Sequence, residues 1–175
     1  MRNALVVADD LTGAMDTGHG FAARGRGVQV RRSAGRDAAG GDPTNNDVLV
    51  VDTDSRDGDA QTAAAAVTRA VETDPAALVY KKVDSTLRGN VVPEVEAAMA
   101  ATGAALAVVA PAFPETGRTT EGGRHLVDGA PLAEAGYGVG ESDLREYFAA
   151  AESPVAHVDT DTVDAGAAAV AERLA

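Results

Sequence analysis

The chain has 175 residues, enough for one domain with a buried core, and its 27 acidic against 15 basic residues give a formal net charge of −12. This charge opposes binding to a nucleic-acid backbone, and the absence of cysteine excludes thiolate metal sites and thiol catalysis. No apolar run of about 18 residues and no basic leader is present, which predicts a cytoplasmic protein without a membrane partner. Few lysines with abundant acidic, alanine and glycine residues are typical of a halophilic composition.

Short apolar runs alternate with alanine-rich segments of helical period, which is the pattern of βαβ units. We therefore predict an α/β fold, a three-layer sandwich with a mostly parallel, Rossmann-like sheet. The expected strands cover residues 4–8, 28–31, 48–51, 77–81, 105–110 and 155–158.

Helices are predicted where apolar residues recur at positions i, i+3 and i+4. The first two of these cover residues 60–71 and 91–99. Asn90 is placed to cap the second helix, and Pro93 and Glu94 suit its first turn.

The remaining chain is predicted to contain two more helices and two long loops. One helix is expected over residues 144–148 after a Ser142 cap, and the other over residues 163–174. Residues 34–46 and 111–140 are rich in glycine and polar or proline residues, so we expect long loops there, which are uncommon unless functional or mobile.

The first candidate site residues follow the first predicted strand. Ligands of an open parallel sheet collect beyond the carboxyl ends of the strands. Asp9 and Asp10 lie there, and one carboxylate could accept a proton from a substrate hydroxyl while the other binds a neighbouring hydroxyl. Thr12 and Gly13 then begin a helix whose free N–H groups favour an anion. An Asp before a helix can also be only its N-cap, and this alternative stays open.

The third and fourth strands are followed by further polar residues. Ser55 and Arg56 offer a hydroxyl and a guanidinium fork, although a plain surface turn is the alternative. The fourth strand leads into a dense run of cations, hydroxyls and a carboxylate ahead of a helix: Lys82, Asp84, Ser85, Arg88 and Gly89. This combination suits a polyhydroxylated anion.

Lysine occurs only at Lys81 and Lys82, whereas arginine occurs at thirteen positions. A compact ammonium with three rotatable donors is therefore expected to be needed here. Strand alternation places Lys82 toward the ligand and Lys81 toward the other face. A chance pair of solvated charges at a strand end is the alternative.

Residues 111–118 include Phe113 and Arg118 and could form a stiff wall of the site or a mere loop. The three histidines have no metal-ligand spacing, so no metal site is assigned. Neither a P-loop nor a Gly-x-Gly-x-x-Gly fingerprint after a strand is present, and no nucleotide site is visible.

Four segments together resemble the four-carbon acid sugar kinase family, which was once known only as a domain of unknown function. They are Ala-Asp-Asp-Leu-Thr-Gly-Ala at 8–14, Asp-Thr-Asp-Ser-Arg at 52–56, Lys-Lys-Val-Asp-Ser-Thr-Leu-Arg-Gly-Asn at 81–90, and Pro-Ala-Phe-Pro with Gly-Arg-Thr-Thr at 111–114 and 117–120. The likeness covers roughly the first 130 residues, and the tail after Pro131 looks shortened against the family pattern.

The resemblance implies a two-domain enzyme whose N-terminal α/β half binds a sugar acid and whose C-terminal half binds ATP and Mg²⁺. Residues 1–175 look like the N-terminal domain only, stopping before its expected last strand, so the C-terminal nucleotide-binding domain or a separate equivalent is an expected partner. The substrate would be erythronate, threonate or an oxo-tetronate, phosphorylated at its terminal hydroxyl. A homo-oligomer stays open.

By the same resemblance, Asp10 or Asp84 would be the base that takes the hydroxyl proton. Lys82, Arg88 and Arg56 would bind the substrate carboxylate. The full set expected to bind substrate is Asp9, Thr12, Gly13, Ser55, Arg56, Lys82, Ser85, Arg88, Gly89, Phe113 and Arg118.

Two other functions are compatible with the sequence. A non-catalytic sugar-acid module or sensor would need no nucleotide site. An aspartyl-phosphate phosphatase would use Asp52 and Asp54, which directly follow an apolar strand, with Lys81 or Lys82 as its cation. Ser55 and Arg56 depart from the continuation expected of such a phosphatase.

Overall fold

The computed structural model describes residues 2–32 and 47–174, so the loop predicted at 34–46 lies outside the described residues. The chain divides into two compact units, Met1–Val109 and Ala110–Ala175. Within the described ranges, no helix has both the length and the apolar character needed to cross a membrane.

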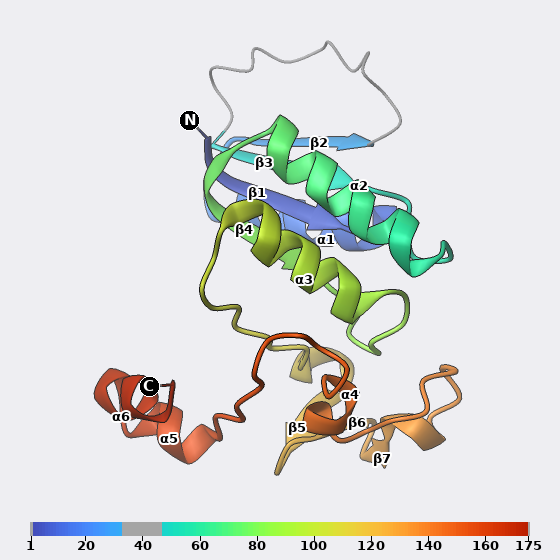
Figure 1. Ribbon diagram of the computed structural model, residues 1–175, viewed down its shortest axis with the longest axis vertical. Coiled ribbons are helices and arrows are strands. Elements are labelled where there is room, and N and C mark those ends of the chain that lie inside the picture. The colour runs from blue at the N-terminus through green and yellow to red at the C-terminus, as the bar shows by residue number, and fades with distance from the viewer. Residues whose placement is uncertain (1, 33–46, 175) are drawn as a thin grey trace. The chain divides into compact units, whose positions relative to one another are not determined.

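The first unit contains a four-stranded sheet in which every pairing is parallel (Figure 1). Its strand order is β2-β3-β1-β4, with bounds β1 Arg2–Ala8, β2 Val28–Arg32, β3 Val48–Asp52 and β4 Ala76–Lys82. These confirm the first four predicted strands. β1 and β3 are central and almost wholly buried, as continuous apolar runs in a parallel sheet should be.

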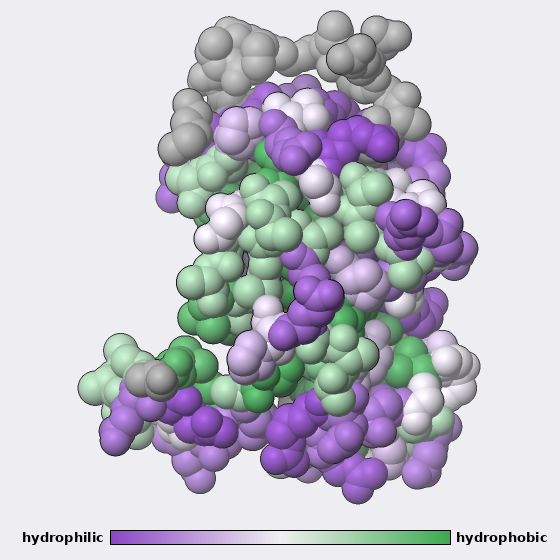
Figure 2. All heavy atoms as spheres, viewed as in Figure 1, coloured by the Kyte–Doolittle hydropathy of each residue, from purple (hydrophilic) through white to green (hydrophobic). Residues whose placement is uncertain are grey.

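Helices cover both faces of this sheet and give three layers (Figure 1). α1 (Leu11–Ala22) lies on one face, while α2 (Ala60–Thr73) and α3 (Val91–Thr102) lie side by side on the other. Figure 2 shows the outer surface of α2 and α3 as largely pale green, because both helices are rich in alanine. The predicted α/β class with a mostly parallel sheet is confirmed.

Alternating strand residues build one core on each side of the sheet. On the side of α2 and α3, the buried cluster is Leu5, Val7, Leu49, Val51, Val67, Ala70, Val71 and Ala98. On the side of α1, it is Ala4, Val6, Ala8, Ala14, Val48 and Val50. The loops that follow β1, β3 and β4 therefore begin from rigid positions.

Helix starts in this unit depart from the sequence prediction at one point. Asp10 caps α1 and Asp59 caps α2 through their side chains. Asn90 stands at the N-cap of α3 but makes no side-chain cap bond. Its amide instead donates to the carbonyl oxygens of Gly58 at 3.0 Å and Ser55 at 3.4 Å, which ties α3 to the loop after β3.

The fifth predicted strand, residues 105–110, is wrong: the segment has no regular secondary structure and pairs with no strand of the described chain. Leu106 is 56% and Val108 82% exposed, and β4 is the sheet edge. An apolar β-branched run has the propensity for a strand, but a strand forms only with a hydrogen-bonding neighbour.

The second unit carries a small antiparallel sheet within the predicted loop 111–140. Its strands are β5 (Arg118–Glu121), β6 (Arg124–Val127) and β7 (Ala130–Pro131), and it is flanked by short 3₁₀ turns η1 (Pro114–Thr116) and η2 (Leu132–Glu134). Gly122-Gly123 and Asp128-Gly129 make the two turns, all with positive φ. Such dipeptides between short strands are a hairpin signal that the sequence prediction missed.

The end of the chain also differs from prediction. α4 (Leu144–Tyr147) is capped by Asp143, whereas the Ser142 hydroxyl accepts from the backbone N–H of Ala133 at 2.9 Å. Residues 155–158 form no strand. The expected last helix is divided into α5 (Thr160–Asp164) and α6 (Ala167–Leu174), because Gly166 has φ +100°.

Candidate functional site

The carboxyl ends of β1, β3 and β4 lie at one edge of the sheet. Ala8, the last residue of β1, is in register with Asp52 on one side and with Lys82 on the other. The segments that follow these three strands are therefore neighbours, as the sequence predicted. We call the charged side chains that meet there the outer cluster: Asp9, Asp10, Arg56, Lys82, Asp84 and Arg88.

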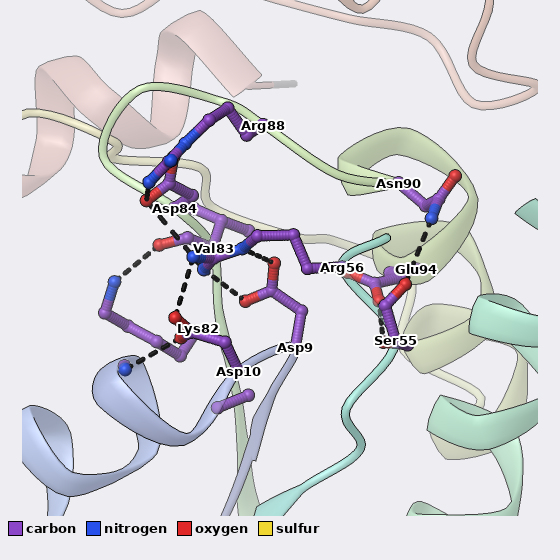
Figure 3. A network of polar contacts seen from close by, with 12 residues as sticks. Asp9, Asp10, Ser55, Arg56, Lys82, Val83, Asp84, Arg88, Asn90 and Glu94 are labelled. Atoms are coloured by element: carbon purple, nitrogen blue, oxygen red, sulfur yellow. Dashed lines mark hydrogen bonds and ion pairs between the residues drawn. The ribbon is translucent and has the colours of Figure 1, made fainter. Parts of the chain in front are cut away.

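Arg56 is the centre of the outer cluster (Figure 3). Its Nε and Nη2 donate to the two carboxylate oxygens of Asp9 at 2.8 and 3.0 Å, and its Nη1 donates to Asp10 at 2.7 Å. The guanidinium also lies 3.8 Å from Asp84. Burial alone would lower the pKa of Arg56, but the hydrogen bond to Asp9 and the surrounding carboxylate charges outweigh it and raise the pKa.

Asp10 both caps a helix and belongs to the outer cluster. One carboxylate oxygen accepts from the Gly13 N–H at 2.8 Å, and the other accepts from Arg56. The side chain of Asp10 is 26% exposed, against 2% for Asp9 and 12% for Asp84. Asp10 is thus the most accessible carboxylate of the cluster.

Asp84 is held by the loop that follows β4. Arg88 donates to its two oxygens at 2.7 and 3.2 Å, and the Thr86 hydroxyl also donates to it. Burial tends to raise the pKa of Asp84, but the hydrogen bonds from Arg88 and Thr86 and the charge of Arg56 lower it well below its ordinary value. The hydrogen bond between Arg88 and Asp84 raises the pKa of Arg88, whose side chain is 45% exposed.

Lys82 approaches the start of α1. A Cβ atom at Gly13 would lie 3.3 Å from Lys82 Cγ and 2.8 Å from an Asp10 oxygen, so the glycine makes room for both side chains. Burial lowers the pKa of Lys82, and the charges of Asp84 and Asp9 offset this only in part. Its ammonium donates to the Val83 carbonyl.

The loop after β4 is strained where it passes the outer cluster. Leu87 is buried and has φ +54°, which is rare for a residue with a large side chain. Gly89 has φ +85°, and a Cβ there would lie 3.2 Å from an Asp9 oxygen and 3.4 Å from Arg56 Cγ. Backbone strain of this kind is concentrated at functional sites.

Beneath the outer cluster, on the α3 side of the sheet, lies a second polar group that we call the inner cluster: Thr53, Ser55, Lys81 and Glu94. Lys81 Nζ lies 3.0 Å from Glu94 Oε2, and the two side chains are 6% and 1% exposed. Ser55 Oγ donates to Glu94 Oε1 at 2.7 Å (Figure 3). The same Ser55 oxygen lies 2.8 Å from the Thr53 hydroxyl.

Glu94 was expected only as a residue of the first turn of α3. It follows buried Val91 by three positions and precedes buried Ala98 by four, so it lies on the apolar face of the helix. An acid at such a position requires a buried partner. That spacing is the signal by which the sequence could have revealed it.

The remaining predicted site residues are less closely tied to these clusters. Thr12 is exposed at the first turn of α1, and Ser85 is half-buried in the loop after β4. Phe113 and Arg118 belong to the second unit, where Arg118 lies over the Tyr137 ring and donates to its hydroxyl. Their role at the site stays a prediction. Asp52, the phosphatase candidate, is fully buried beside Arg32.

The carboxylates of the outer cluster do not form a ready-made cation site. Among the described residues, no group of three or more His, Cys, Asp or Glu could hold a metal ion. Each carboxylate of the outer cluster is instead in an ion pair with an arginine. A cation held by protein carboxylates alone would have to displace these arginines, so the described residues do not fit such a site.

Several known proteins are similar to this chain in sequence and fold. Residues 4–175 match the family described as the sugar-binding N-terminal domain. A D-threonate kinase of Salmonella typhimurium is 48% identical over 74% of the chain, and a D-erythronate kinase of Heliobacterium modesticaldum is 39% identical over 77%. The chain spans 31% of the length of each relative.

A solved structure shows the same fold. It is a domain of unknown function from Bordetella bronchiseptica, described as a domain-swapped dimer with bound citrate. It is 36% identical, with a TM-score of 0.80, over 97% of this chain and 45% of its own. The chain therefore belongs to the four-carbon acid sugar kinase family and contains its sugar-binding N-terminal domain.

Proposed function

We propose that this chain is the substrate-binding half of an ATP-dependent kinase that phosphorylates the terminal hydroxyl of a four-carbon sugar acid. The outer cluster is the observation that carries the proposal: cations and carboxylates alternate at the strand ends of a chain related to D-threonate and D-erythronate kinases. We place the ATP and Mg²⁺ site in a part of the enzyme outside these residues, because this sequence has neither a P-loop nor a Gly-x-Gly-x-x-Gly fingerprint after a strand.

Lys82 and Arg88 are the proposed partners of the substrate carboxylate. Arg56 already donates to Asp9 and Asp10, so its role is to hold those carboxylates rather than to meet the ligand. Arg88 also pairs with Asp84, but its side chain is 45% exposed against 17% for Arg56, so a ligand can reach it. Lys82 carries a charge that burial disfavours, so a nearby anion would stabilise its ammonium form.

Asp10 is the proposed acceptor of the proton from the terminal hydroxyl. Phosphoryl transfer depends mainly on positioning and charge, and it needs an acidic side chain to orient the attacking hydroxyl. Asp10 is the most exposed carboxylate of the cluster and is fixed from both sides by Gly13 and Arg56. Asp84, whose side chain is 12% exposed, then accepts a hydrogen bond from another hydroxyl, whereas Asp9 is 2% exposed and holds Arg56.

A sugar-acid-binding module without catalysis is the second candidate. The absence of a P-loop and of a dinucleotide fingerprint from this sequence favours it for the isolated chain. The two functions separate when phosphoryl transfer from Mg-ATP to threonate is assayed with the chain alone and with the C-terminal portion of a relative added. Restored transfer supports the kinase half, and binding without transfer in both cases supports the module.

Calorimetric titration with threonate, erythronate and the uncharged polyol erythritol tests the binding step. We expect at least one acid to bind with a dissociation constant in the range of about 1 μM to 1 mM, which is common for metabolic substrates. Erythritol should bind at least about tenfold more weakly, since it lacks the charge-assisted hydrogen bonds. Equal binding of erythritol, or no binding of either acid, would contradict the proposal.

A further inference from the structure

We propose that Lys81 and Glu94 are positioning residues that set the place of Arg56 through Ser55. This inference deepens the proposed function, on which its ligand-binding readout rests, and assigns a role to the second of the two lysines. None of the three residues needs to touch the substrate.

The first step is the buried ion pair. Lys81 Nζ and Glu94 Oε2 are 3.0 Å apart, and both side chains are almost wholly excluded from water. The Lys81 ammonium also donates to the Lys82 carbonyl oxygen at 2.8 Å. Glu94 is thereby fixed against the carboxyl end of β4, with its second oxygen directed at the loop after β3.

The second step is the hydrogen bond that this Glu94 oxygen accepts from the loop after β3. Ser55 has one hydroxyl proton, and it is donated to Glu94 Oε1 at 2.7 Å. Ser55 is 4% exposed, so its hydroxyl faces the inner cluster and not solvent. Under this proposal, Ser55 anchors the loop and does not donate to a substrate hydroxyl.

The third step is the transmission to Arg56. The backbone N–H groups of Ser55 and Arg56 both donate to the Asp9 carbonyl oxygen, at 3.0 and 3.3 Å. Asn90 holds the Ser55 carbonyl from the other side. The Arg56 side chain extends from this hydrogen-bonded backbone to Asp9 and Asp10. A shift of the backbone at Ser55 therefore moves the guanidinium.

The energetics favour a positioning role over a purely stabilising one. Replacing a buried ion pair by apolar side chains of similar volume is often neutral or stabilising. Lys81 and Glu94 are therefore not needed for stability alone. What an apolar pair cannot supply is the acceptor oxygen that fixes Ser55.

Two double variants that differ only in this acceptor test the inference. Lys81→Met with Glu94→Met removes both charges and the acceptor, whereas Lys81→Met with Glu94→Gln removes the charges but keeps an amide oxygen. We expect both to melt within about 4 °C of the wild type. Only the first should move or broaden the Arg56 Nε–H NMR signal and weaken threonate binding about tenfold.

The methionine pair could fail to fold, and Ser55→Ala then makes the same break with a smaller change. We expect Ser55→Ala to move the Arg56 signal as well. An unchanged Arg56 signal in Ser55→Ala, or equal changes in the two double variants, would overturn the inference. A wild-type chain that binds no sugar acid overturns the proposed function instead, because the Arg56 signal is measured without ligand.

Discussion

The outer and inner clusters both pair acidic with basic side chains at the same sheet edge, yet the charged groups differ in their access to water. Lys81 and Glu94 are sealed from water and have each other as partners. Asp10 and Arg88 are partly exposed, so a ligand can reach them. Under the proposed function, burial more than residue type separates a binding group from the scaffold that holds it.

The two lysines show how adjacent positions of one strand produce this difference. Successive side chains of a strand point to opposite faces. Lys82 turns toward Gly13 at the start of α1, and Lys81 turns toward Glu94 on α3. Two identical neighbours thus serve different clusters, as the alternation predicted.

The largest expected effect comes from Glu94→Ala in the inner cluster. The substitution leaves the Lys81 charge buried without its partner, so the free energy of unfolding should fall by about 3–5 kcal/mol. Urea unfolding followed by circular dichroism measures it. Glu72→Ala, at an exposed position of α2, is the control and should change stability by less than about 0.5 kcal/mol. Similar losses in the two variants would contradict the distinction between the clusters.

Gly89→Ala should lower both stability and ligand affinity, because it disturbs the outer cluster through the backbone. The positive φ costs about 1–2 kcal/mol for a residue with a side chain. The new Cβ would also crowd Asp9 and Arg56, so threonate affinity should fall as well. Gly25 also has positive φ but nothing within 4 Å, so Gly25→Ala isolates the conformational cost. If both variants bind threonate as the wild type does, Gly89 has no role in shaping the site.

Lys82→Met should separate affinity from stability. Loss of a charge-assisted contact to the ligand carboxylate should weaken threonate binding about tenfold to a hundredfold, corresponding to about 1.5–3 kcal/mol. The folded state lowers the pKa of Lys82, so it disfavours the charged form, and removing that charge should leave stability equal or higher. Calorimetry and thermal melting measure the two quantities. A stability loss as large as that of Glu94→Ala would place Lys82 in the scaffold.

The smallest expected effect is a pH dependence of stability caused by Asp84. The pKa of Asp84 is lowered in the folded state, so its stabilising contribution is present above the ordinary value of 3.8 and is lost as pH falls below it. The melting-temperature difference between wild type and Asp84→Asn should therefore be constant near neutral pH and shrink below pH 4. A difference that grows on acidification would have the wrong sign.

The sheet and the outer cluster could be predicted because both depend on local sequence. Apolar runs locate the strands, and a parallel sheet brings the following residues to one edge. The sequence therefore predicts that Asp9, Arg56 and Asp84 lie together, and their ion pairs confirm it. It could not show that Arg56 is occupied by carboxylates, because that depends on side-chain geometry.

The sequence predictions that were wrong concern features that depend on partners distant in the chain. Residues 105–110 have strand composition, but the sequence does not show whether an edge will pair with them. Asn90 has the chemistry of a cap, but it binds the loop after β3 instead. Glu94 was read as a helix-dipole residue because its partner Lys81 is thirteen positions away on another element.

Backbone NMR of the chain titrated with threonate tests most directly whether the outer cluster is the sugar-acid site. We predict the largest amide shift changes at Asp9 to Gly13, at Arg56, and from Lys82 to Gly89, with saturation at the affinity found by calorimetry. Saturable binding with shift changes confined to residues outside these segments would contradict the assignment of the site.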